Sequence, residues 1–150
     1  MLGGRLLDGA DGNAGHIGHV IVDPVGRPCV CGAIGCLEAQ VSGAAIAAAT
    51  GRPAAEATVS QRVTAGRLVG RAVASVCNLL DLRLAVVAGS VALGFGDVFF
   101  DAANEELDRC ARIDFARGAL IVPSADGTRG PIVGAAAVGL RGIGRDVGIA

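Results

Sequence analysis

Apolar residues recur at helical intervals between Thr58 and Asp81, with arginines in the positions between them. This spacing places the apolar side chains on one face of a helix and the charged side chains on the other. The pattern predicts a single amphipathic helix over 58–81 with an apolar face made of Val63, Leu68, Val69, Val73, Val76, Cys77, Leu79 and Leu80. We expect Cys77 on this face to be a buried, unreactive thiol.

A continuous apolar run, LAVVA at 84–88, is short and rich in β-branched residues, as in a buried parallel strand. Three more elements follow it: a helix over 97–112, a strand over 119–123 and a helix over 131–141 with proline in its first turn. Strand, helix, strand and helix in this order predict α/β layering.

The first third of the chain is rich in glycine, and its pattern is weaker. The side-chain pattern of residues 19–23 alternates and is rich in β-branched residues, which predicts a strand. Residues 36–49 are mostly small, which predicts one helix that stops at Gly51. We also expect a short strand at 5–7 and a loose tail at 142–150. Because no internal repeat or linker is found, we expect a single domain over 1–150.

Composition narrows the function classes. The 150 residues are 52% hydrophobic and carry a formal net charge of −1, which indicates neither a nucleic-acid surface nor a disordered chain. Residues 1–13 contain no apolar core long enough for a signal peptide, and no apolar run reaches the roughly 18 residues that a membrane span needs. We therefore expect a cytoplasmic protein with no membrane partner and no nucleic-acid partner.

The segment 19–38 carries the strongest chemical signal. It contains His19 and then Cys29, Cys31 and Cys36 in a loop thick with glycine and proline. Three thiolates and an imidazole are a complete tetrahedral ligand set for zinc, and the glycines let the backbone fold tightly enough to bring them together. The segment predicts a closed, structural zinc site.

Two other arrangements would use the same cysteines: a disulfide, or thiols that pack as small buried apolar groups. A Cys-x-Cys pair such as Cys29 and Cys31 is too tight for an easy disulfide. Nothing else in the sequence indicates an oxidising compartment, and reduced thiols favour a metal over a disulfide.

The run GHIGHVIVDPVGRPCVCGAIGCLE at 15–38 closely resembles the zinc-containing signature of the ROK family, which comprises bacterial sugar kinases, sugar-responsive repressors and related proteins. The histidine, the ten-residue gap, Cys-x-Cys and Cys-Leu-Glu occur together, and later segments fall in the family's order. The resemblance covers nearly the whole chain.

The resemblance implies an actin-like, ribonuclease H-type α/β fold, of which this chain is the C-terminal lobe with a zinc-binding loop. The family's phosphate loop and its catalytic aspartate belong to an N-terminal half that these residues do not match. We therefore expect an incomplete lobe, a fragment whose strands leave an exposed edge.

The same resemblance assigns residues that contact sugar. Glu38 matches the family's sugar-binding glutamate, and His19 matches the residue that binds zinc through one ring nitrogen and faces the sugar with the other. His16 stands where family kinases commonly have glutamate, and it offers one acceptor when neutral and none when charged. Glu38 could instead be a plain helix-start charge, and His16 a second imidazole near zinc or a solvent-facing residue.

Residues after the first predicted strand resemble the family's glycine segment, which lies along adenosine. The resemblance assigns nucleotide contacts to Gly89, Ser90 and Gly94, since glycine permits a close backbone approach. A tight structural turn would have the same pattern. Residues 134–136 resemble the small-residue helix that lines the same cleft.

No catalytic residue is assigned. Phosphoryl transfer needs a base and a cradle for phosphate and magnesium, and Asp8, Asp11 and Asp23 lie beside glycine or proline, where aspartate forms turns. We expect a fragment of a glucokinase-like, ATP-dependent hexose kinase, inactive alone, that takes a hexose or amino-sugar and forms a homo-oligomer. It would use ATP and magnesium only with the missing half. Two alternatives are the sugar-sensing domain of a transcriptional regulator and a non-catalytic remnant.

Overall fold

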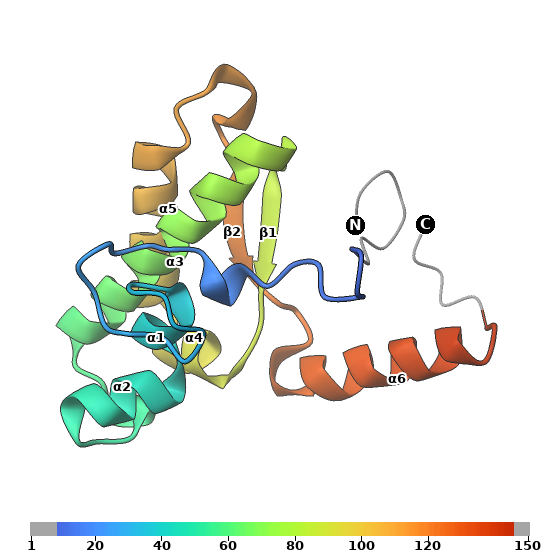
Figure 1. The fold of residues 1–150 in the computed structure, drawn as a ribbon, viewed down its shortest axis with the longest axis horizontal. Coiled ribbons are helices and arrows are strands. Elements are labelled where there is room, and N and C mark those ends of the chain that lie inside the picture. The colour runs from blue at the N-terminus through green and yellow to red at the C-terminus, as the bar shows by residue number, and fades with distance from the viewer. Residues whose placement is uncertain (1–8, 146–150) are drawn as a thin grey trace.

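Two parallel strands form the sheet of the computed structural model, which describes residues 9–145. Strand β1 (Leu84–Val87) pairs in parallel with β2 (Leu120–Pro123), with Leu84 opposite Leu120 and Val87 opposite Pro123. Helices α3 (Val59–Leu80) and α5 (Asp97–Cys110) lie along the sheet, and the loop that contains the cysteines lies beside α1 (Leu37–Val41) and α3 (Figure 1). The predicted α/β layering with parallel strands is confirmed.

The predicted amphipathic helix is confirmed as α3 (Val59–Leu80). It begins with a capping box, in which the Thr58 hydroxyl accepts a hydrogen bond from the Gln61 amide and the Gln61 side chain accepts one from the Thr58 amide. It ends at Asp81, which has a left-handed backbone conformation. Helix α5 (Asp97–Cys110) packs against it, close to the predicted bounds 97–112.

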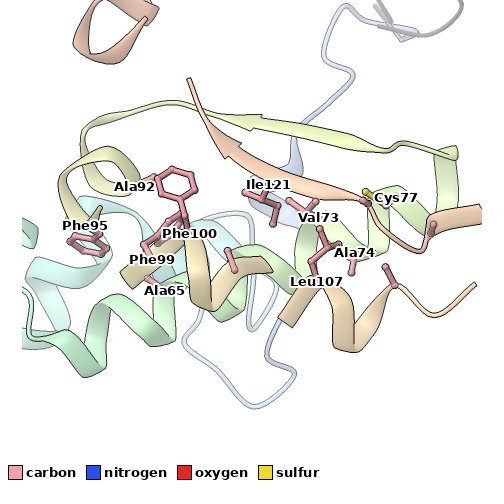
Figure 2. Close-up of a cluster of buried hydrophobic side chains, with 14 of the residues drawn as sticks. Ala65, Val73, Ala74, Cys77, Ala92, Phe95, Phe99, Phe100, Leu107 and Ile121 are labelled. Carbon is pink, nitrogen blue, oxygen red and sulfur yellow. The ribbon is translucent and has the colours of Figure 1, made fainter. Parts of the chain in front are cut away.

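The core lies between α3, α5 and β2 (Figure 2). Phe99 and Leu107 of α5 and Cys77 of α3 are at most 2% exposed. The low exposure confirms that Cys77 is buried, and burial raises the pKa of its thiol.

The prediction that the LAVVA strand is buried is wrong. Ala85 and Val87 of β1 pack towards the core, but Leu84 and Val86, which point the other way, are 57% and 60% exposed. Side chains of a strand alternate between faces, and helices of the described residues cover only one face of this sheet. The run is therefore apolar on both faces of the strand, although the described residues cover only one of these faces.

The strand predicted at 19–23 is also wrong. Residues Ile17–His19 form a short 3-10 helix, and Ile21 makes only an isolated antiparallel bridge with Cys36. The partner segment turns at glycines with positive φ, so it offers no straight edge along which a longer ladder could form.

The single helix predicted at 36–49 is two helices, α1 (Leu37–Val41) and α2 (Gly43–Thr50). Ser42 between them is extended, with φ −63° and ψ 152°, and its hydroxyl accepts the amide of Ala45 to begin α2. Helix α2 then ends at Gly51, as predicted.

The remaining elements connect or extend this unit. Helix α4 (Ser90–Phe95), which the sequence pattern did not predict, follows β1, and three further 3-10 turns occur at Ala54–Glu56, Asp114–Ala116 and Gly127–Arg129. Helix α6 (Gly130–Gly142) confirms the last predicted helix and projects away from the sheet (Figure 1). The strand predicted at 5–7 and positions 146–150 of the predicted tail lie outside the described residues. No helix within 9–145 is long and apolar enough to cross a membrane.

Candidate metal centre

Two antiparallel bridges fold the cysteine loop back on itself. Ile21 pairs with Cys36, Pro28 pairs with Ile34, and the amide of Val22 donates to the carbonyl of Gly35 at 2.9 Å. Gly35 has a φ of +80°, and a Cβ added there would collide with the Asp23 carbonyl oxygen. Only glycine fits this crossing, so the loop closes because of it.

The loop gathers the four predicted donors. The ligand atoms of His19, Cys29, Cys31 and Cys36 all lie within 4.8 Å of one another. The Sγ of Cys29 is 3.7 Å from Nδ1 of His19, and the Sγ atoms of Cys31 and Cys36 are 3.6 Å apart. Tetrahedral zinc with bonds of about 2.3 Å to sulfur would separate its sulfur ligands by about 3.8 Å. The spacing and the chemistry of the donor set therefore fit a metal such as zinc.

The thiols of this cluster differ in how readily they ionise. Burial raises the pKa of Cys36 to about 11, and the neighbouring thiols add to this. A hydrogen bond with the Ala33 backbone lowers the pKa of Cys31, as do bonds with Cys29 and Cys36. Cys36 would therefore need a nearby cation to become a thiolate at neutral pH, and a coordinated metal would supply it.

The three predicted sugar-facing residues, His16, His19 and Glu38, lie at or beside this cluster. Helix α1 begins at Leu37 and places Glu38 in its first turn, and a Cβ built on Gly18 would lie 3.4 Å from Oε2 of Glu38. The rings of His16 and His19 stack with centroids 5.9 Å apart. All three side chains are exposed, and Gly18, which lies against Glu38, is between the two histidines in the sequence.

Arg27 fixes this surface to the loop, a role that the sequence reasoning missed. Its guanidinium donates to the carbonyls of Ala39 and Gln40, the first at 2.8 Å. In an unbroken helix those carbonyls would accept the amides four residues later, but the break at Ser42 leaves them free. The arginine inside the cysteine loop was a signal that could have suggested it.

A second missed residue, Arg71, holds the base of the loop. Its Nη1 donates to the carbonyl of Val22 at 3.3 Å, and its Nε donates to Glu106 of α5. Val22 and Leu37 pack with Ala72 of α3 in a small apolar cluster beneath the loop. The loop is therefore joined to the main core by the hydrogen bond from Arg71 and by this apolar cluster.

Two of the predicted nucleotide residues lie at the end of β1, near the end of α1. Gly89 and Ser90 line a hollow of about 330 Å³ at the end of β1, together with Val41 from the end of α1. Gly89 has a φ of +108°, which favours glycine, and Ser90 begins α4. Gly94 lies within α4 and is not among the residues that line the hollow.

The chain was compared with known proteins. It is 40% identical over 109 residues to N-acetylmannosamine kinase of Escherichia fergusonii, an alignment that covers 63% of this chain and 38% of that protein. The chain thus spans well under half the length of this relative.

Solved structures resemble the fold as well. A ROK family glucokinase from Streptomyces griseus, in complex with glucose and AMPPNP, matches with a TM-score of 0.72 and 25% identity over 89% of this chain and 54% of its own. A ROK family transcriptional regulator, a homologue of the E. coli MLC protein, matches with a TM-score of 0.67 and 26% identity over 80% of this chain and 37% of its own.

The family model gives the widest match. The ROK family model aligns with residues 1–141 of the 150. The match includes the cysteine loop, both strands and nearly all of α6, so it does not depend on the loop alone. This chain belongs to the ROK family.

Proposed function

We propose that this chain is the sugar-binding and metal-holding part of a ROK-type sugar kinase that acts on a hexose or an N-acetylated hexosamine. The observation that carries the proposal is the exposed surface formed by His16, His19 and Glu38 beside the four-donor cluster. The relatives named above, a kinase of N-acetylmannosamine and a glucokinase, support the sugar class.

The chemistry of each side chain suits a sugar hydroxyl. The Glu38 carboxylate accepts two hydroxyls at once. His19 faces Cys29 with Nδ1, which leaves Nε2 available to a sugar. His16, stacked parallel to His19, adds one acceptor while it is neutral. Together these groups would orient the ring by its hydroxyls.

His19, Cys29, Cys31 and Cys36 would hold zinc in this proposal. With four protein ligands the site is closed, so the metal would fix the loop and would not activate water. Gly35, Arg27 and Arg71 act with these donors to hold the loop against α1 and α3. The rigidity that results keeps Glu38 and His19 on one surface.

Nucleotide binding is assigned to Gly89, Ser90 and Gly94, with ATP and magnesium as the phosphoryl donor. The hollow beside Gly89 and Ser90 supports this, and Val41 links it to the helix that carries Glu38. Transfer itself needs a base and a phosphate cradle. Asp23, a conceivable base, instead accepts the Val25 amide in a turn at 3.3 Å. We therefore expect these 150 residues alone to bind sugar without phosphorylating it.

The test is sugar binding by calorimetry with glucose, mannose and N-acetylmannosamine. We expect wild type to bind one of them, and Glu38→Gln to weaken that binding about 10- to 100-fold, because a hydrogen bond to a charged group contributes about 1.5–3 kcal/mol. The matched control is Glu56→Gln, which changes an exposed carboxylate in the 3-10 turn Ala54–Glu56, outside the proposed sugar-binding residues. This variant should bind sugar normally. Wild type that binds no sugar, or Glu38→Gln that binds equally well, would refute the proposal.

A second candidate is the sugar-sensing domain of a transcriptional regulator, which the structural likeness to a ROK regulator favours. Both candidates bind sugar, so nucleotide binding separates them. The kinase proposal expects AMPPNP to bind and Gly89→Val to abolish that binding. The regulator proposal expects sugar binding without nucleotide, and a non-catalytic remnant would bind neither.

We further propose that residues 1–150 form one domain of an actin-like lobe in a cytoplasmic, homo-oligomeric protein. The main core cluster, which joins α3, α4, α5 and β2, supports the first point, and five free cysteines are consistent with a reducing compartment. One cooperative unfolding transition would support the single domain, and sedimentation would give the oligomeric state.

A further inference from the structure

The cysteines of this protein are all free, and the sulfur atoms of two of them lie close together. Cys31 is exposed and its Sγ lies 3.6 Å from that of Cys36, which is fully buried. Cys29 faces the His19 ring. Cys77 lies in the helical core and Cys110 at the end of α5, so both are outside the donor cluster.

The backbone allows Cys31 to move towards its neighbour. Cys31 lies in a tight turn in which the Gly32 amide donates to the Cys29 carbonyl, and Val30 before it is 99% exposed. Cys36 is fixed by its bridge with Ile21. A disulfide has a sulfur–sulfur length of about 2.05 Å, so the thiols need to approach by about 1.5 Å. A shift of the exposed turn that carries Cys31 would supply that distance.

We propose that Cys31 and Cys36 form a thiol pair that a hydroperoxide oxidises to a disulfide, and that this disulfide and a bound metal exclude each other. The bond removes two of the four donors, and the two that are left, His19 and Cys29, are too few to hold zinc. The exclusion rests on the metal centre proposed above, whereas formation of the disulfide does not.

The oxidation balances with hydrogen peroxide as the oxidant. The Cys31 thiolate attacks one peroxide oxygen, so a sulfur–oxygen bond forms, the oxygen–oxygen bond breaks, and the released hydroxide takes a proton to become water. Cys36 sulfur then attacks the sulfenic sulfur of Cys31. The sulfur–sulfur bond forms, the sulfur–oxygen bond breaks, and a second water leaves with the Cys36 proton. Two thiols are oxidised and one peroxide is reduced to two waters.

Metal-free protein tests the pair by itself. After treatment with a slight excess of hydrogen peroxide and removal of the reagent, we expect free thiols to fall from five to three. The intact mass should fall by about 2 Da, and peptide mapping should join Cys31 to Cys36. Dithiothreitol should restore all five thiols. A disulfide that maps to another pair, or oxidation that dithiothreitol does not reverse, would overturn the proposal.

Two variants control this experiment. Cys110→Ser removes a cysteine outside the cluster and should leave the disulfide and its rate unchanged. Cys29→Ser removes the third sulfur of the cluster and should still form the Cys31–Cys36 bond. Loss of the bond in Cys29→Ser would show that Cys29 is the reacting partner and would overturn the assignment.

Zinc-loaded protein tests the exclusion. A chromogenic chelator should register release of about one zinc per chain as the disulfide forms, and dithiothreitol with added zinc should reverse both changes. A disulfide that forms while zinc stays bound would overturn the exclusion. If wild type takes up no zinc at all, the proposed metal centre fails, and the metal-free result alone decides whether the thiol pair is real.

Discussion

Glu106 is the one buried charged side chain among the described residues, at 5% exposure. Arg109 donates to both of its oxygens, at 2.6 and 2.9 Å, and Arg71 donates to one of them. The hydrogen bonds from Arg109 are the largest cause of the lowered pKa of Glu106. Burial opposes this shift and Arg71 adds to it, so the pKa of Glu106 is about 2. Because Arg71 also holds the Val22 carbonyl, this carboxylate connects α5 to the cysteine loop.

The first prediction concerns pH. A carboxyl whose pKa is about 2 when folded and 4.5 when unfolded stabilises the fold above pH 4.5, and that contribution is lost as the pH falls towards 2. Glu106→Gln should lower the free energy of unfolding at pH 7 by on the order of 2 kcal/mol, since its partly exposed arginine partners are screened by solvent. Urea unfolding at pH 7 and pH 3 checks this.

The control for this prediction is the next residue of the same helix. Glu105 is 73% exposed and lies 3.7 Å from Arg67, so Glu105→Gln should change stability by less than about 0.5 kcal/mol at either pH. Equal effects of the two substitutions, or a Glu106→Gln deficit that persists unchanged at low pH, would contradict the assigned pKa.

The donor cluster carries the second prediction at this scale. Cys31→Ser should lower zinc content and thermal stability together, because serine is a poor ligand for zinc and metal binding contributes to folding. Metal analysis of untagged protein should find about one zinc per wild-type chain. Cys110→Ser, outside the cluster, should keep full metal content, and a Cys31→Ser protein with full metal content would exclude Cys31 as a ligand.

At the scale of elements, glycines decide how closely α3 and α5 approach. A Cβ on Gly66 would collide with the Phe99 carbonyl of α5, and one on Gly70 with the Ala103 carbonyl. Both glycines lie one turn apart on the buried face of α3. The two helix backbones are therefore in direct contact, and the core residues of both helices are positioned by that contact.

Gly70→Ala should destabilise the protein by about 1–3 kcal/mol, because the backbone of α5 has to move, although alanine is the better helix former by about 1 kcal/mol. Gly134→Ala on α6 is the matched substitution, since a Cβ there meets nothing within 4 Å. It should leave stability unchanged or raise it by up to about 1 kcal/mol. Thermal unfolding of both variants measures the difference, and a neutral Gly70→Ala would contradict the close contact.

At the scale of the whole molecule, two packed regions of unequal size meet at α3. The larger is the core between α3, α5 and β2, and the smaller is the cluster of Val22, Leu37 and Ala72 beneath the cysteine loop. The loop buries little apolar surface of its own, so its order depends on the donor cluster, Arg27 and Arg71.

Removal of the metal should therefore loosen the cysteine loop and leave the main core unchanged. After chelation we expect amide hydrogen exchange in 19–38 to rise by about tenfold or more, while exchange in α5 near Phe99 and Leu107 stays slow. Hydrogen-exchange mass spectrometry with and without zinc measures this. A uniform rise through α3 and α5 would show that the two regions unfold as one, and no rise in the loop would show that the metal does not order it.

Local signals in the sequence were sufficient for the long helices and for the composition of the four-donor cluster. Helix α3 has both an amphipathic pattern and a capping box at Thr58, so its ends follow from neighbouring residues. The four donors were identified by type and spacing, because ligand chemistry admits few residue types and the glycines between them permit a tight loop. The sequence by itself determined these features, since each depends on residues close together in the chain.

Tertiary structure alone decided the features that depend on distant residues. The break at Ser42 coincides with Arg27 taking the carbonyls that a continuous helix would have used, and the open face of β1 depends on which elements cover the sheet. Arg71 reaches Val22 across 49 positions, a contact that no local pattern encodes. The placement of Glu38 beside Gly18 likewise comes from the folded loop. Side-chain chemistry can be read from the chain, but which side chains meet is settled only when the backbone has packed.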